Sequence, residues 1–179
     1  MPDKNICSIY KEQKQVRPKP EDVAGAFLDP ERASAMLGFV AFLRENKINI
    51  QWGSGNSWTL NYKGKRLGYL KIYTGILGKP ALPHLDKSWF FCHNRLFLDR
   101  YYTMEDSPLK TFVFDNIYAR NCGNCLLTNA IPNEQKAGYM NPTGCGCFPL
   151  RIFNADSEAL EYTQQLVSFR MKCIVESKL

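Results

Sequence analysis

The stretch INIQWGSGNSWTLNYKGKRLGYLKIY, residues 48–73, decides the fold that the sequence predicts. Apolar and polar residues alternate over 48–52 and again over 58–62, and a period of two is typical of half-buried strands. Gly53-Ser54-Gly55-Asn56 separates the two segments and has the composition of a turn. A second tight turn follows at Lys63-Gly64-Lys65, and the alternation then continues on Leu67, Tyr69, Lys71 and Tyr73. The stretch therefore predicts consecutive antiparallel strands joined by short turns.

Helix signals precede this meander. Asp29-Pro30-Glu31 combines a capping aspartate, proline at the first helical position and an acidic first turn. Apolar residues then recur at helical spacing as far as Asn46, and another helix start is expected at Pro20-Glu21-Asp22. After a Gly/Pro-rich connection over 75–83, residues 88–93 are expected to form a fourth strand. Together these signals predict an α+β fold, with a short antiparallel sheet packed by helices.

The order of these elements is similar to that of a known group of domains. A helix, a Trp-bearing strand, the segment Trp58-Thr59-Leu60-Asn61-Tyr62-Lys63-Gly64-Lys65 and a further aromatic strand resemble the uncharacterised bacterial α+β domains of the YdhG and YjbR type. The resemblance extends over residues 30–120. It implies a twisted antiparallel sheet with helices on one side, and binding of a small ligand or a protein. It transfers no catalytic residue, and the cysteine-rich segment beyond it is not part of the family pattern.

Four cysteines are grouped in the C-terminal third, Cys122, Cys125, Cys145 and Cys147. They lie in a connection of about thirty-five residues between two predicted helices, 108–120 and 156–171, and so long a loop needs an internal stabilising element. The first pair has C-x2-C spacing, nineteen residues follow, and the second pair has C-x-C spacing. Four thiolates complete the tetrahedral coordination of Zn²⁺ and leave no position for water. The sequence therefore predicts a structural zinc site in a loop over 121–150.

Two other uses of these cysteines stay open. One is an iron–sulfur or redox-labile site, and the other is a set of reduced thiols or disulfides without metal. A zinc ribbon that binds nucleic acid is disfavoured, because Lys136 is the only basic residue between the two pairs.

The composition is that of an ordinary globular domain, with 45% hydrophobic and 22% charged residues. The formal net charge of +6 suits an acidic partner or nucleic acid but requires neither. Residues 1–19 are expected to form a basic, extended and partly ordered arm, followed by a single α+β domain over 20–179. No leader peptide and no membrane-length apolar run is visible, and clustered thiols fit a reducing compartment. We therefore expect a cytoplasmic protein.

Aromatic residues of the predicted sheet are the candidate ligand-binding residues. These side chains either line an apolar pocket between sheet and helices or form the sheet's core. They are Trp52, Trp58, Tyr62, Tyr69 and Trp89. For catalysis the sequence offers only His84, in a proline-flanked loop, and Cys92, in a predicted strand. No phosphate-binding loop, dinucleotide fingerprint, nucleophile elbow or zinc-protease motif accompanies them.

These observations favour a non-enzymatic binding protein over an enzyme. In this interpretation, zinc is structural and an aromatic-lined face binds a small ligand or a protein. One alternative is a small enzyme that uses a pocket histidine, tyrosine or cysteine. The other is a weak nucleic-acid binder, in which the basic arm and the cations near the second turn act with the aromatic residues. Those cations are Lys63, Lys65, Arg66 and Lys71.

The zinc hypothesis predicts one zinc ion per purified chain, measured by elemental mass spectrometry. Chelation should lower the melting temperature, because the free energy of metal binding contributes to the free energy of folding. Cys145→Ser should lose the metal, whereas Cys7→Ser, which changes a cysteine far from the cluster in sequence, should retain it. Iron with visible absorbance, or a metal-free protein whose melting is insensitive to chelator, would contradict the prediction.

Overall fold

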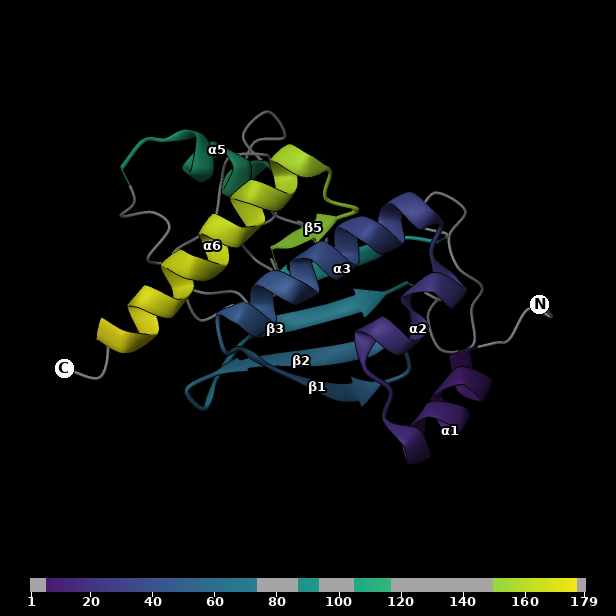
Figure 1. The fold of residues 1–179 in the computed structure, drawn as a ribbon. Coiled ribbons are helices and arrows are strands. Elements are labelled where there is room, and N and C mark those ends of the chain that lie inside the picture. The colour runs from purple at the N-terminus through teal and green to yellow at the C-terminus, as the bar shows by residue number, and fades with distance from the viewer. Residues whose placement is uncertain (1–5, 74–86, 94–104, 117–149, 177–179) are drawn as a thin grey trace, which may run out of the picture.

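A computed structural model describes residues 6–73, 87–93, 105–116 and 150–176, which form five helices and a five-stranded antiparallel sheet (Figure 1). The helices are α1 (Ile6–Val16), α2 (Pro20–Phe27), α3 (Pro30–Glu45), α5 (Pro108–Asp115) and α6 (Ser157–Glu176). The strands are β1 (Asn49–Ser54), β2 (Ser57–Tyr62), β3 (Lys65–Ile72), β4 (Trp89–His93) and β5 (Arg151–Phe153). The predicted α+β class is confirmed. The four cysteines of the predicted metal loop lie outside the described residues.

Helix α3 begins and ends where its local signals predict. The side chain of Asp29 accepts a hydrogen bond from the backbone N–H of Arg32 at 2.9 Å, and Pro30 occupies the first turn. At the other end, the side-chain amide of Asn46 donates to the carbonyl of Phe42 at 2.9 Å. Lys47 then takes a left-handed conformation, with φ of 57°, and turns the chain into β1.

The strands follow one another in the order β1-β2-β3-β4-β5, each antiparallel to its neighbour. The first four confirm the predicted meander. Strand β5 was not predicted, because three residues are too few to show an alternation. It pairs with β4 at the edge of the sheet, with Ile152 opposite Phe91.

A register shift between β2 and β3 changes which residues share a face. Leu60 pairs with Gly68 but Asn61 pairs with Arg66, so Leu67 is an extra residue in β3. The sequence predicted Leu67 and Tyr69 on the same face, and this was wrong. The bulge turns Leu67 into the core, where it is fully buried, whereas Tyr69 is 37% exposed.

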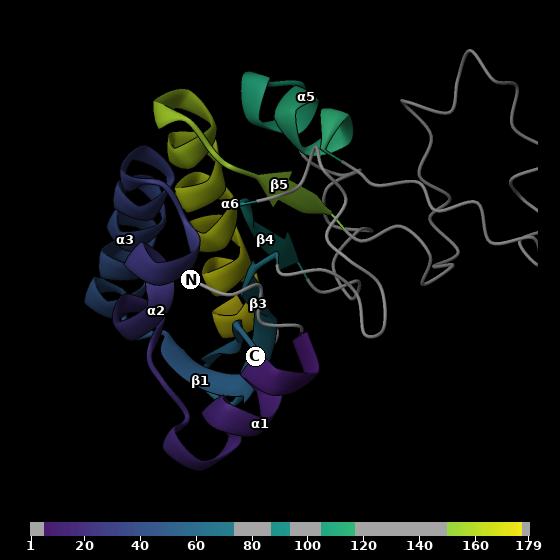
Figure 2. The same ribbon diagram turned by 90° about the vertical axis from the view of Figure 1, so that its right-hand side faces the viewer.

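The hydrophobic core lies between the sheet and helices α3 and α6, which cross the same face of the sheet (Figures 1 and 2). At its centre, the ring of Phe39 lies 6.1 Å from that of Trp89 and 5.4 Å from that of Phe91, measured between centroids. All three side chains are completely buried. Burying large aromatic side chains is among the strongest contributions to the free energy of folding. The same core contains Met36, Val40, Leu43, Trp58, Leu60, Leu70, Ile72, Ile152, Leu166 and Val167.

Residues 6–16 form helix α1, and the predicted extended arm was wrong over this range. The helix packs on the β1–β2 turn through Gln13, which is only 7% exposed. Its side-chain amide donates to the Asn56 side chain at 2.6 Å, and its oxygen accepts from the Asn56 backbone at 2.9 Å and the Trp52 indole at 3.2 Å. The tertiary contact therefore orders a segment whose polar composition suggested none.

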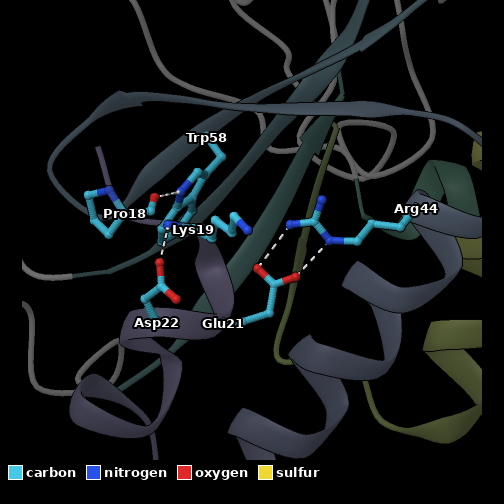
Figure 3. Close-up of polar contacts among 6 residues, drawn as sticks. All are labelled: Pro18, Lys19, Glu21, Asp22, Arg44 and Trp58. Carbon is cyan, nitrogen blue, oxygen red and sulfur yellow. Dashed lines mark hydrogen bonds and ion pairs between the residues drawn. The ribbon is translucent and has the colours of Figure 1, made fainter. Parts of the chain in front are cut away.

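The segment after α1 is tied to the sheet and to α3 (Figure 3). The indole N–H of Trp58 donates to the carbonyl of Pro18 at 2.7 Å. Arg44 of α3 forms two hydrogen bonds with the carboxylate of Glu21 in α2, at 2.7 and 3.1 Å. Both side chains of this ion pair are well exposed, so the indole contact fixes the segment more firmly than the pair does.

Replacing Gln13 by alanine tests the anchoring of α1. The substitution removes three hydrogen bonds and leaves buried groups of Asn56 unsatisfied, so we expect a loss of about 1–3 kcal/mol in the free energy of unfolding. Gln15→Ala is the matched control, because Gln15 is exposed on the same helix, and it should change stability by no more than about 0.5 kcal/mol. Urea denaturation of both variants measures the difference. Equal effects would mean that Gln13 does not anchor the helix.

Candidate functional site

The face of the sheet opposite α3 and α6 carries a distinct set of side chains. Register places Tyr69, Cys92 and Arg151 in one row across β3, β4 and β5. Lys71, Phe90 and Phe153 form the next row. The bulge at Leu67 adds Arg66 to the same face as Tyr69. We call this surface the cationic face and define it by Arg66, Tyr69, Lys71, Phe90, Arg151 and Phe153.

Cations and aromatic rings are interleaved on the cationic face. The guanidinium carbon of Arg66 lies 5.8 Å from the centroid of the Tyr69 ring. That of Arg151 lies 5.8 Å from the ring of Phe90, which in turn lies 5.0 Å from the ring of Phe153. These distances are in the range of cation–π attraction and aromatic pairing. Each guanidinium group therefore lies over an aromatic ring, Arg66 over Tyr69 and Arg151 over Phe90.

The cationic face brings two positive charges close together. Burial lowers the pKa of the Lys71 ammonium, and the nearby positive charge of Arg151 lowers it further. None of the five described strands contains an aspartate or a glutamate, and no carboxylate of the described residues forms an ion pair with Lys71. Holding two like charges near each other costs stability, and such arrangements are concentrated at functional sites.

Several side chains of the cationic face remain accessible. Tyr69 is 37% exposed, and Lys71, Arg151 and Phe153 are half-buried. Phe90 is 9% exposed and forms the floor beneath them. Accessible cations above a buried ring can reach a ligand while their aliphatic stems stay packed.

The same face becomes polar and uncharged towards β1. Gln51, Thr59 and Tyr69 stand opposite one another in one row, and Asn49, Asn61 and Arg66 in another. Amide and hydroxyl groups beside the cationic face can both donate and accept hydrogen bonds.

Carboxylates gather elsewhere, around a groove of about 420 Å³ between α5 and α6. Its floor includes Phe112 and Tyr162, whose ring centroids are 5.0 Å apart. Asp115, Asp156 and Glu158 also line it. Asp156 caps α6 by accepting the backbone N–H of Ala159 at 2.8 Å, so at least one of these acids has a structural role.

Four of the five aromatic residues singled out from the sequence pack in or against the core, and only one lies on the cationic face. Trp58 and Trp89 are 1% and 0% exposed and belong to the core on the helix-covered face. Trp52 and Tyr62 are half-buried and pack against the same core. Tyr69 lies on the opposite face. Of the five, only Tyr69 belongs to the cationic face.

Cys92 is 5% exposed and lies between Tyr69 and Arg151 in its row. Burial raises the pKa of its thiol, although the neighbouring Arg151 acts in the opposite direction. A protonated, buried thiol is a poor nucleophile. The other catalytic candidate, His84, lies outside the described residues, as do Cys122, Cys125, Cys145 and Cys147. Among the residues that the structure does describe, no three His, Cys, Asp or Glu side chains form a group able to hold a metal ion.

Sequence reasoning missed Phe90, Arg151 and Phe153 as members of a site. Phe153 and Arg151 belong to the unpredicted strand β5, and Phe90 lies in a nearly continuous aromatic run with no readable alternation. One available signal was that the five described strands contain lysines and arginines, in β3 and β5, but no acidic residue.

The fold and this surface define an α+β protein with a cationic, aromatic sheet face. In comparisons with protein-family models, curated proteins and solved structures, nothing matches this chain. The resemblance to YdhG and YjbR-type domains therefore stays a prediction. Within the described ranges, no helix has both the length and the apolar character needed to cross a membrane.

Lys71→Met tests the electrostatic cost of the cationic face. We expect the free energy of unfolding at neutral pH to rise by roughly 0.5 kcal/mol or more, because methionine keeps an apolar stem and removes the repulsion with Arg151. The pKa of Lys71 is lower in the folded state than in the unfolded state. Between these two pKa values, the unfolded state therefore holds more protons than the folded state, and stability rises with pH. The loss of stability caused by the charged Lys71 is therefore fully present below the folded-state pKa and disappears at higher pH. The stability gain of the variant should shrink as pH approaches 10.5.

Urea denaturation at neutral and alkaline pH measures this difference. All other ionisable groups are common to the two proteins, so their contributions largely cancel in the comparison. Lys172→Met is the control, because the Lys172 side chain is 75% exposed on α6. A Lys71→Met variant that is less stable than the parent protein at neutral pH would show that Lys71 does not destabilise the fold.

Proposed function

We propose that this protein is a non-enzymatic binding protein whose cationic face binds an anionic ligand. The observation that carries the proposal is the half-buried Lys71 ammonium beside Arg151, on a sheet whose described strands contain no carboxylate. An anion placed between these cations supplies the opposite charge. Its binding therefore offsets the repulsion between them and favours the charged form of Lys71.

The aromatic residues add a second component to recognition. Tyr69 offers an accessible ring, and Phe90 and Phe153 form an apolar floor below the cations. Because all of these groups stand on hydrogen-bonded strands, they are held in place before a ligand arrives, which lowers the entropic cost of binding. Such a face fits a ligand that combines negative charge with a flat, apolar part.

Binding is favoured over catalysis because the one described catalytic candidate, Cys92, has a raised thiol pKa and is buried. Within this proposal, Zn²⁺ at the four cysteines keeps the structural role predicted from their spacing. A cytoplasmic location also belongs to the proposal, since it rests on the reducing environment that clustered thiols need.

Thermal melting in the presence of dextran sulfate tests the proposal at low salt. A ligand that binds only the folded protein stabilises it by RT ln(1 + [L]/Kd), about 2.7 kcal/mol at a hundredfold excess over Kd. We expect dextran sulfate to raise the melting temperature and uncharged dextran to leave it unchanged. Lys71→Met should reduce the rise, and Lys172→Met should preserve it. No rise with dextran sulfate, or an equal rise in both variants, would refute the proposed site.

A further inference from the structure

The anion that best fits the cationic face is a polymer with both phosphates and accessible rings. Resting on the proposed function above, we infer that this face binds single-stranded nucleic acid. Phosphates contact Arg66, Lys71 and Arg151, and an unpaired base stacks on the ring of Tyr69. The inference rests on the interleaving of cations and rings, on their accessibility and on the uncharged polar residues of β1 and β2 beside them.

Tyr69 is placed as a stacking platform. It is 37% exposed at the middle of β3, and its neighbours on both adjacent strands are uncharged, Thr59 on β2 and Cys92 on β4. The guanidinium carbon of Arg66 lies over the ring, 5.8 Å from its centroid, and adds a second planar group to this platform. Base–aromatic stacking tolerates any base, because every base has a π-face, and arginine adds a cation–π contribution.

The cations surround this ring at distances set by the sheet. Lys71 is two residues further along β3, which is about 7 Å, and Arg151 is two strands away, which is about 10 Å. Arg66 extends this path towards the β2–β3 turn, with its guanidinium carbon 5.8 Å from the centroid of the Tyr69 ring. A flexible polyanion can follow this path and contact the cations in succession, which a single small anion cannot do.

The rows next to Tyr69 suit base edges. Gln51 and Asn49 are exposed, and Thr59 and Asn61 are half-buried. Their amides and hydroxyl donate and accept hydrogen bonds without adding charge. Polar groups of this kind can contact whichever base is stacked nearby, so we expect weak sequence preference.

A duplex fits this face less well than a single strand. In double-stranded nucleic acid the bases are stacked and paired inside the helix, and a tyrosine on a sheet face cannot stack on them. Single strands splay their bases onto aromatic side chains and let the backbone run over neighbouring cations. The exposed ring therefore favours a single strand, whereas the charges alone would accept any polyanion.

Fluorescence anisotropy with labelled oligo(dT) and oligo(U), using the full-length protein, tests the inference. Three phosphate contacts predict that the logarithm of the binding constant falls with the logarithm of salt concentration with a slope of about −2. A duplex of the same length should bind more weakly than the single strand. Dextran sulfate should compete only at low salt.

Four variants assign the contributions of ring and charge. Tyr69→Ala should weaken binding about 5- to 150-fold, and Tyr69→Phe should preserve it, since stacking needs the ring and not the hydroxyl. Lys71→Met should make the salt slope less steep by about 0.7. Tyr10→Ala, which removes a tyrosine of similar exposure in α1, should leave binding unchanged. The melting temperature of each variant shows that it is folded.

The outcomes separate this inference from the proposed function. Binding of single strands that depends on both Tyr69 and Lys71 supports both. In two other results, dextran sulfate binds through Lys71 while either Tyr69→Ala loses no affinity for oligonucleotides or the duplex binds as tightly as the single strand. Either result overturns the nucleic-acid inference and leaves the anion-binding proposal in place. No binding of any polyanion at low salt overturns both.

Discussion

The packing of Phe39 against Trp89 and Phe91 is the interaction on which the rest of the structure depends. It joins α3 to β4 with three fully buried rings. Because α3 and α6 cover one face of the sheet, every second residue of each strand lies on the opposite face. The cationic face is a consequence of this choice, because Tyr69, Lys71 and Arg151 occupy the positions that the core does not use.

The bulge at Leu67 adjusts this division at one point. Without an extra residue in β3, strict alternation would place Leu67 beside Tyr69 and turn Arg66 towards the core. With it, a leucine is buried and an arginine joins the opposite face next to a tyrosine. One inserted residue therefore serves both the core and the surface, which fits the common role of bulges in redirecting side chains.

Charge is distributed unevenly among the described elements. The strands hold cations without acids, whereas Asp115, Asp156 and Glu158 gather at the groove between α5 and α6. The unfavourable environment of Lys71 lowers stability, and natural proteins commonly accept such a cost at sites that bind a ligand. A fold whose core is built from many large aromatic residues can tolerate that cost.

Local signals in the sequence determined much of the fold. The Asp29 cap and Pro30 set the start of α3, and the alternation over 48–62 set β1 and β2, because these signals act between residues near in the chain. Helix α1 depended on a buried contact between Gln13 and Asn56, and β5 on pairing with β4, so no local pattern revealed them. The candidate site is likewise tertiary. The sequence contained Tyr69 and Lys71 as candidates, but only the sheet places Arg151 beside them, since strand pairing joins residues that are remote in the chain.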